Sequence, residues 1–133
     1  MTYEQTLDYL YNQLPVFQQI GAKAYKPGLQ NSEALDRYFG YPHRKFKTIH
    51  IAGTNGKGST SHLLAAILQK SGYKTGLYTS PHLIDFRERI RVNGEMISQS
   101  YIINFTEKHI PKTKNIHPSF FELTTAMAFR YFA

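Results

Sequence analysis

The beginning of the chain carries apolar side chains at the spacing of one helix face. The apolar positions recur every three or four residues, at Leu7, Leu10, Tyr11 and Leu14. Thr2 and Gln5 stand three residues apart, a spacing that lets each side chain bond the other residue's backbone N–H. The pattern therefore predicts an amphipathic helix over residues 2–14 that begins with a capping box.

The middle of the chain alternates between short β-rich runs and a helical run. Residues 46–52 are β-rich, residues 61–71 are helical in character and end at Gly72, and residues 74–79 are again β-rich. A strand, a helix and a second strand at this separation predict a βαβ unit in a parallel sheet with a right-handed crossover. The expected fold class is therefore α/β.

Turn and capping signals divide much of the remaining chain. We expect a short helix from Asn31 or Ser32 to Phe39, and a hairpin turn at Asn93-Gly94. A further helix is expected from Ser98 or Ser100 to about residue 109, followed by a loop over 111–118.

A last helix is expected to follow Ser119. Ser119 and Glu122 repeat the capping-box spacing, and Leu123, Met127 and Tyr131 follow at helical intervals. The sequence stops inside this apolar helix without a capping glycine or a polar tail. We therefore expect the N-terminal part of a longer enzyme.

Composition excludes several classes of protein. Of the 133 residues, 41% are hydrophobic and the mean hydropathy is −0.42, which is typical of a globular domain with one core. No cysteine is present, so neither a disulfide framework nor a thiolate metal site can form. The N-terminus lacks a signal-peptide pattern, and no apolar run approaches the roughly 20 residues of a membrane span. We expect a cytoplasmic protein without a membrane partner.

The net charge of +7 reflects 16 Lys and Arg residues against 9 Asp and Glu residues. These basic residues are spread along the chain, and they are not interleaved with aromatic residues as in nucleic-acid-binding modules. We therefore expect no nucleic-acid partner. A small polyanionic substrate is one alternative explanation of the charge.

The segment between the first β-rich run and the helical run has the composition of a phosphate-binding loop. It reads Gly53, Thr54, Asn55, Gly56, Lys57, Gly58, Ser59, Thr60. Glycines let backbone N–H groups crowd around an anion, because no Cβ blocks positive φ or close approach. Lys57 adds a flexible cation for the outer phosphates of a nucleotide. We assign this segment to ATP binding and Lys57 to catalysis.

The loop departs from the common Walker pattern at one position. Gly58 follows the lysine where that pattern has a serine or threonine, whose hydroxyl holds Mg²⁺. The ligand must therefore come from Ser59, Thr60 or another loop. The segment from Thr79 to Leu83 leaves the carboxyl end of the next predicted strand, where ligands bind in open α/β sheets.

Several segments together resemble one known family. They are Lys26-Pro27-Gly28-Leu29, His50–Thr60, Tyr78–Ser98 and, more weakly, Pro118–Phe132. On these residues the chain resembles the folylpolyglutamate synthase/dihydrofolate synthase family of the Mur ligase superfamily. Other Mur ligases share a similar phosphate loop but lack the segment SPHLIDFRERI at residues 80–90.

The resemblance implies a fold and a division of the chain. The fold is the N-terminal part of a Mur-ligase ATP-binding domain: a P-loop-type parallel sheet flanked by helices, preceded by a helical segment. Its parts are a helical lead-in over 1–45, a βαβ unit with the phosphate loop over 46–79, a substrate-flanking loop over 80–98 and helices over 99–133. The rest of that domain and a C-terminal domain are expected to be absent, which would leave this piece inactive alone.

The resemblance also implies an activity. ATP would phosphorylate a substrate carboxylate, and the amine of L-glutamate would attack the acyl phosphate. The acceptor would be a folate, dihydropteroate or both, and the cofactors ATP and Mg²⁺, with a monomer expected at full length. The alternatives are another Mur-type ligase and a nucleotide-binding fragment without catalytic activity.

The resemblance implies roles for further residues. Ser80 takes the position of a Mg²⁺ ligand. The implied substrate-binding residues are Lys26, Pro27, Gly28, Leu29, His82, Ser119, Phe120, Phe121 and Glu122. For Glu122 a helix cap or pocket wall is favoured over a metal ligand, and Phe120 or Phe121 either stacks on a pterin ring or belongs to the core.

Overall fold

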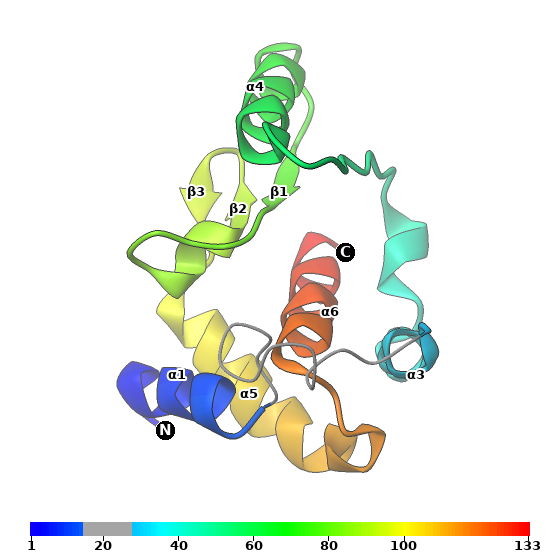
Figure 1. Cartoon of the computed structure of the whole chain (residues 1–133), viewed down its shortest axis with the longest axis vertical. Coiled ribbons are helices and arrows are strands. Elements are labelled where there is room, and N and C mark those ends of the chain that lie inside the picture. The colour runs from blue at the N-terminus through cyan, green and yellow to red at the C-terminus, as the bar shows by residue number, and fades with distance from the viewer. Residues whose placement is uncertain (15–27) are drawn as a thin grey trace.

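Helices make up most of this computed structural model, which describes residues 1–14 and 28–133. The α-helices are α1 (Tyr3–Asn12), α3 (Gln30–Tyr38), α4 (Lys57–Lys70), α5 (Gln99–Thr113) and α6 (Phe120–Phe132). Short 3-10 helices lie at η2 (Pro42–Lys45), η3 (Phe86–Arg89) and η4 (Lys114–Ile116), and the strands are β1 (Gly76–Tyr78), β2 (Ile90–Val92) and β3 (Glu95–Met96). Figure 1 shows α1, α3, α5 and α6 grouped at one end, with α4 beyond the sheet at the other.

Two predicted capping boxes fix helix starts. Thr2 and Gln5 bond each other's backbone N–H at the start of α1, and Ser119 and Glu122 do the same at α6. Each pair satisfies two backbone donors that the first helical turn leaves without partners. The positions of these two helices along the chain are therefore determined locally.

Two other helix boundaries differ from the prediction. Helix α3 begins at Gln30 with Leu29 as its N-cap, so neither Asn31 nor Ser32 caps it. Helix α5 continues to Thr113, and Pro111 lies in its last turn. A proline near a helix end removes one backbone hydrogen bond without stopping the helix, and the hydroxyl of Thr113 bonds the carbonyl of His109 at 3.0 Å.

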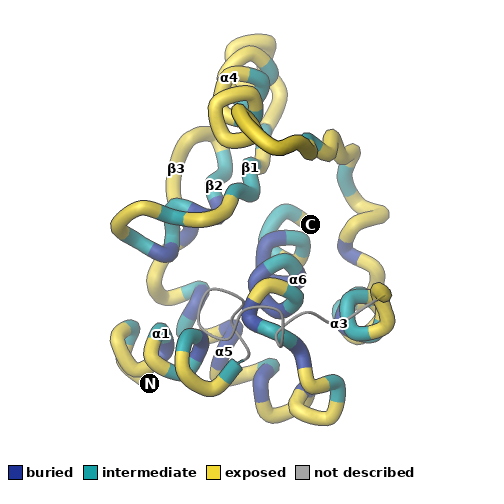
Figure 2. The backbone as a smooth tube through the Cα atoms, viewed as in Figure 1, coloured by how far each residue is buried: buried dark blue, intermediate teal, exposed yellow. Residues whose placement is uncertain are grey.

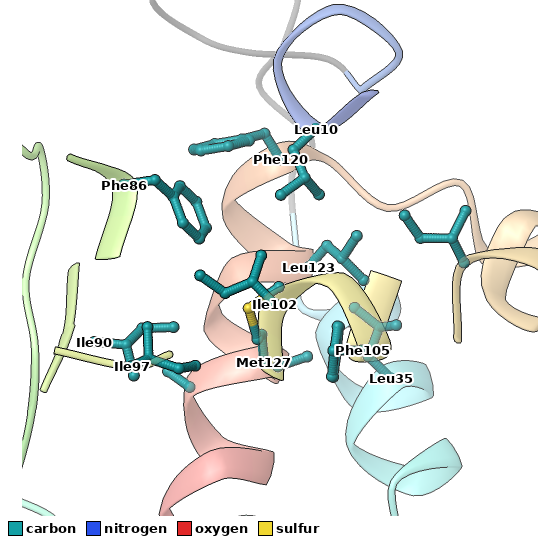
Figure 3. Packing of buried hydrophobic residues seen from close by; sticks show 13 residues of the cluster. Leu10, Leu35, Phe86, Ile90, Ile97, Ile102, Phe105, Phe120, Leu123 and Met127 are labelled. Atoms are coloured by element: carbon teal, nitrogen blue, oxygen red, sulfur yellow. The ribbon is translucent and has the colours of Figure 1, made fainter. Parts of the chain in front are cut away.

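Helix α6 forms the centre of the hydrophobic core. Its buried residues Leu123 and Met127 face Ile102 and Phe105 of α5, with Leu35 of α3 beside them (Figure 3). Each such side chain contributes about 1.5–3 kcal/mol through its removal from water. The core also reaches the sheet, because Ile90 of β2 is fully buried. Figure 2 shows the buried positions concentrated around α5 and α6.

The sheet is antiparallel, which corrects the expected parallel βαβ arrangement. β1 pairs with β2 through Gly76↔Val92 and Tyr78↔Ile90, and β2 pairs with β3. Asn93 (φ 50°) and Gly94 (φ 80°) form the predicted hairpin turn between β2 and β3. Residues 79–89 return the chain beside β1, and a tight turn joins β2 to β3, so each pair is antiparallel; a parallel pair would need a crossover connection, usually a helix.

Residues 46–52 have no regular secondary structure and do not form the predicted strand in the described part of the chain. Their start is held to α6, since the ring of Phe46 lies 5.9 Å from the rings of both Phe129 and Phe132. β1 approaches the same end of α6 closely: a Cβ added at Gly76 would lie 2.7 Å from Cδ1 of Phe132. The strand prediction failed because β-rich composition requires a hydrogen-bonded neighbour, which the described residues do not provide.

Helix α4 stands apart from the core. None of its residues is buried, although it contacts β1. It begins at Lys57, four residues before the predicted start, because Gly56 adopts a left-handed conformation (φ 76°) and turns the chain into the helix. Gly72 (φ 92°) follows its C-cap as predicted.

Candidate functional site

The glycine-rich loop before α4 has the backbone geometry of an anion cradle. Gly53 (φ 155°) and Gly56 (φ 76°) adopt positive φ values that favour glycine, and residues 52–60 are all exposed. The first amides of α4, from Lys57 to Ser59, have no carbonyl four residues earlier within the helix. No side chain caps this end of α4. The helix start therefore presents free N–H groups and the positive end of its dipole to solvent.

The ammonium group of Lys57 lies against the loop itself. Its Nζ donates to the carbonyl oxygen of Gly53 at 2.5 Å and contacts that of Thr54 at 3.5 Å. The lysine is the first residue of α4, so its charge lies beside the exposed amides. Gly58 adds no side chain here, and a Cβ built on it would meet nothing within 4 Å. This arrangement can accept a polyphosphate through backbone amides and one mobile cation.

The predicted metal ligand Ser80 lies on the exposed loop that follows β1. Its position after a strand packed on α4 agrees with the predicted placement at a strand end. However, no group of three or more His, Asp or Glu side chains able to hold a metal occurs in residues 1–14 and 28–133. Mg²⁺ takes six oxygen ligands, and these commonly include waters and the phosphates of a bound nucleotide as well as protein oxygens.

The loop that follows β1, residues 79–85 and here called the Ser80 loop, is built around the carboxylate of Glu88. This carboxylate accepts the backbone N–H groups of Leu83, Ile84 and Asp85 at 3.0, 3.1 and 2.8 Å. These bonds hold the pKa of Glu88 below its usual range. Leu83 and Ile84 are each 92% exposed, so the ordered backbone presents two apolar residues to solvent.

His82 has partners at both ring nitrogens. Arg89 Nε donates to Nδ1 at 2.7 Å, and Nε2 lies 3.0 Å from the hydroxyl of Tyr11. Burial and the nearby guanidinium of Arg89 lower the pKa of His82. The predicted substrate-binding histidine is thus committed to contacts within the protein in this conformation.

At the start of α6, the two predicted stacking residues lie in different environments, one buried and one exposed. Phe120 is buried, and its ring stacks on that of Tyr11 at a centroid distance of 5.3 Å. Phe121 is 54% exposed, and its ring lies 6.2 Å from that of Tyr78. Phe120 therefore belongs to the core, whereas Phe121 offers a free face to a flat ligand.

Glu122 has the structural role that the S-x-x-E spacing predicts. Its Oε2 accepts the backbone N–H of Ser119 at 2.8 Å and the side-chain amide of Asn31 at 3.2 Å. The second contact joins α6 to α3. The same residue also lines a cavity.

This cavity has a volume of about 230 Å³ and lies between α3, η2 and α6. Leu29, from the segment that resembles the family, and Glu122 both line it, although 93 positions separate them in the sequence. Apolar groups such as Phe129 form part of the wall, and three carboxylates contribute to it: Glu33, Asp36 and Glu122. Gly28 (φ 87°) precedes Leu29 at the boundary of the described part. Lys26 and Pro27 lie outside the described residues.

Sequence reasoning missed three residues that organise these loops: Tyr11, Tyr78 and Arg89. Their side chains join the Ser80 loop or β1 to other elements through contacts that span up to 71 positions in the sequence. No local spacing signals such a contact. The only sequence feature that pointed to any of these three residues was the position of Arg89 in the segment Glu88-Arg89-Ile90. By its pattern alone, Arg89 would be an exposed basic residue.

The chain resembles known proteins over nearly all of its length, although no sequence-family model matches it. It is 43% identical over 114 residues to the dihydrofolate synthase/folylpolyglutamate synthase of Bacillus subtilis, covering 81% of this chain and 26% of that protein. The crystal structure of folylpolyglutamate synthase from Thermotoga maritima has a TM-score of 0.81 and 43% identity, covering 98% of this chain and 30% of that one. A folylpolyglutamate synthase complex with AMPPCP and folate has a TM-score of 0.81 and 31% identity, over 99% and 32% of the two chains.

These similarities confirm the α/β fold class. The chain spans about a quarter to a third of the length of these three proteins. Among the described residues, no helix has the length and apolar character needed to cross a membrane. The identity and the shared fold together establish that the chain belongs to the folylpolyglutamate synthase/dihydrofolate synthase family.

Proposed function

We propose that this chain supplies the nucleotide side of an ATP-dependent ligase that joins L-glutamate to a folate, to dihydropteroate or to both. The observation that carries the proposal is the loop at the start of α4. Two glycines with positive φ precede a lysine at the first helical position, and the following amides are exposed. Such an end binds phosphate groups through oriented N–H groups. A structural relative of this chain was solved with an ATP analogue and folate together.

In the proposed reaction, an oxygen of the substrate carboxylate attacks the γ-phosphorus of ATP, and ADP leaves. The amine of glutamate then attacks the carbonyl carbon of the acyl phosphate, loses a proton and expels inorganic phosphate. The exposed amides of Lys57, Gly58 and Ser59 would orient the phosphates, and the Lys57 ammonium would offset charge that builds up on the transferred group.

The acceptor would bind on the α6 side of the chain. Phe121 presents an exposed ring for stacking, and Glu122 and Leu29 line the neighbouring cavity. A carboxylate in a cavity wall can accept N–H groups from a nitrogen-rich ring. Ser119 holds Glu122 in position through the capping box. His82 would support this region through Tyr11 and Phe86 and would not bind the acceptor in the conformation described.

Ser80 remains our proposed Mg²⁺ ligand. Its hydroxyl lies on the loop after β1, next to the strand that contacts α4. The ion would supply charge neutralisation at the phosphates. The roles proposed for Lys57, Gly58 and Ser59 do not depend on the ion.

Nucleotide binding by this chain is the first test. Titration of the 133-residue protein with AMPPCP should give saturable binding that Lys57→Ala weakens at least tenfold, since a direct charge–phosphate contact contributes about 1.5–3 kcal/mol. Lys70→Ala, at the other end of α4, is the matched control and should bind normally. Equal binding by both variants would contradict the assignment of the loop.

Ligase activity requires a polypeptide of the length of the relatives. Release of ADP that depends on glutamate should be measured with dihydropteroate and with tetrahydrofolate separately, because nothing in the chain distinguishes the two acceptors. Activity with either acceptor supports the proposal. If the polypeptide binds nucleotide but releases no ADP in response to glutamate with either acceptor, the ligase assignment is refuted and the chain is a nucleotide-binding module.

A further inference from the structure

Arg89 is a buried cation with an unusual set of neighbours. Only 4% of the residue is exposed, and none of the ion pairs within the described ranges includes it. Its guanidinium carbon lies 5.1 Å from the centre of the Phe120 ring. Burial lowers the pKa of Arg89, as expected for a charge removed from water. A buried charge without a carboxylate is costly unless hydrogen bonds and ring contacts compensate it.

The principal hydrogen bond of this side chain goes to a histidine. Arg89 Nε lies 2.7 Å from Nδ1 of His82. A guanidinium can only donate, so Nδ1 must contribute its lone pair. A neutral imidazole then carries its proton on Nε2, and this N–H points to the Tyr11 hydroxyl at 3.0 Å. Arg89 therefore donates a hydrogen bond to His82, and His82 donates one to the hydroxyl of Tyr11.

The same residue also holds the other end of the loop. The backbone carbonyl of Arg89 accepts the N–H of Thr79 at 3.0 Å, just before Ser80. Its side chain holds His82, just after the Ser80-Pro81 peptide. Glu88, the preceding residue, binds the amides of the rest of the loop. Residues 80 and 81 thus lie between two hydrogen bonds to Arg89, one from the Thr79 N–H and one to the His82 ring. The His82 ring in turn contacts Tyr11 of α1.

We propose that Arg89 is a positioning residue that holds His82 in its Nε2–H tautomer and thereby fastens the Ser80 loop to helix α1. The consequence for catalysis rests on the proposed function, in which this loop borders the phosphates. The tautomer itself does not depend on catalysis. An arginine suits this position better than a lysine, because its planar guanidinium can lie over Phe120 while Nε donates sideways.

The test is a two-bond ¹H–¹⁵N spectrum of the histidine rings in the 133-residue protein, recorded at a pH where histidines are neutral. The expected wild-type signature is a single Nε2–H tautomer for His82. A wild-type Nδ1–H tautomer, or a fast-exchanging mixture, would overturn the proposal without any variant.

Variants then assign the cause. Arg89→Met keeps a long side chain over Phe120 but removes the donor, so the His82 tautomers should mix and the Leu83 amide should exchange with solvent at least tenfold faster. Tyr11→Phe keeps the ring stack on Phe120 and the Arg89 bond, so the tautomer should persist. Arg91→Met is the matched control, because Arg91 bonds only the Glu88 carbonyl among the described partners. A tautomer that changes in Tyr11→Phe and persists in Arg89→Met would assign the role to Tyr11 and refute ours.

An activity measurement separates this inference from the proposed function. In a polypeptide with ligase activity, Arg89→Met should lower kcat at least tenfold, while Arg91→Met retains it. A protein with no ligase activity would refute the proposed function and leave the tautomer result intact. Full activity in Arg89→Met, together with an unchanged tautomer, would refute the positioning role.

Discussion

The hydroxyl of Tyr78 lies 3.1 Å from the hydroxyl of Thr125 and so joins the end of β1 to α6. Thr124 lies at a similar distance, 3.2 Å, from the same phenol. Thr125 also lines the cavity beside Glu122. One phenol therefore connects the strand that precedes Ser80 with the wall of the candidate acceptor site.

Replacing Tyr78 by phenylalanine should lower the free energy of unfolding by about 1–2 kcal/mol, because the buried hydroxyl of Thr124 and the partly buried hydroxyl of Thr125 each lose a partner while the ring remains. Urea denaturation measures this difference. Tyr73→Phe is the control. Tyr73 is 65% exposed, so the loss of its hydroxyl should change the free energy of unfolding by less than about 0.5 kcal/mol. Similar losses in both variants would show that the Tyr78 contacts contribute nothing specific.

Alanine at two glycines of the phosphate loop should have opposite effects on stability. Gly56→Ala places a Cβ in a left-handed conformation (φ 76°) and should destabilise the chain by about 1 kcal/mol. Gly58→Ala lies in the first turn of α4 with nothing within 4 Å of its Cβ, so it should stabilise the helix by about 0.5–1 kcal/mol. Thermal unfolding distinguishes the two variants. Greater stability of Gly56→Ala would contradict the loop geometry.

The same pair of variants reports on binding when AMPPCP is titrated. If phosphate approaches the amide of residue 58, then Gly58→Ala should weaken binding even though it stabilises the fold, because a Cβ occupies the approach. Unchanged affinity in Gly58→Ala would place the nucleotide elsewhere.

The neighbouring phenylalanines of α6 should respond differently to alanine. Phe120→Ala removes a buried ring and should cost about 3–5 kcal/mol of folding free energy. Phe121→Ala removes an exposed ring, should cost less than about 1 kcal/mol, and should weaken folate binding in a polypeptide that binds folate. Fluorescence titration with folate measures the second effect. Normal folate affinity in Phe121→Ala would remove this residue from the proposed site.

Stability should fall at acid pH because of Asp85. Hydrogen bonds from the Arg87 side chain, together with those from the Arg87 amide and the Tyr3 hydroxyl, lower the pKa of Asp85 from 3.8 to about 2. The folded pKa lies below the unfolded one, so this stabilisation is complete above about pH 4 and is lost as the pH falls through about 2.

Asp85→Asn should therefore lower stability by about 1 kcal/mol near neutral pH and flatten the loss of stability between about pH 4 and pH 2. Urea denaturation at several pH values measures both effects. Glu95→Gln, on the exposed strand β3, removes the same charge and should leave the slope in this range largely unchanged. An unaltered slope in Asp85→Asn would show that another group dominates acid unfolding.

Local sequence patterns were sufficient to predict the structure wherever a few neighbouring residues determine the backbone conformation. The capping boxes at Thr2 and Ser119, the turn at Asn93-Gly94 and the glycine-rich entry into α4 all follow from side chain–backbone bonds or from φ preferences within a few positions. The predicted strand over 46–52 failed for the opposite reason. A strand is stable only when another segment pairs with it, and composition does not say which segment that is.

By itself, the sequence determined the family and the position of the glycine-rich loop before α4, because these depend on residue identities and short spacings. Only the tertiary structure decided which aromatic residue is accessible, Phe121 and not Phe120. It also decided that Leu29 and Glu122 share a cavity and that Arg89 and Tyr11 occupy both nitrogens of His82. These relationships depend on how α1, α3 and the loop after β1 pack against α6, and such packing brings together residues that no local pattern connects.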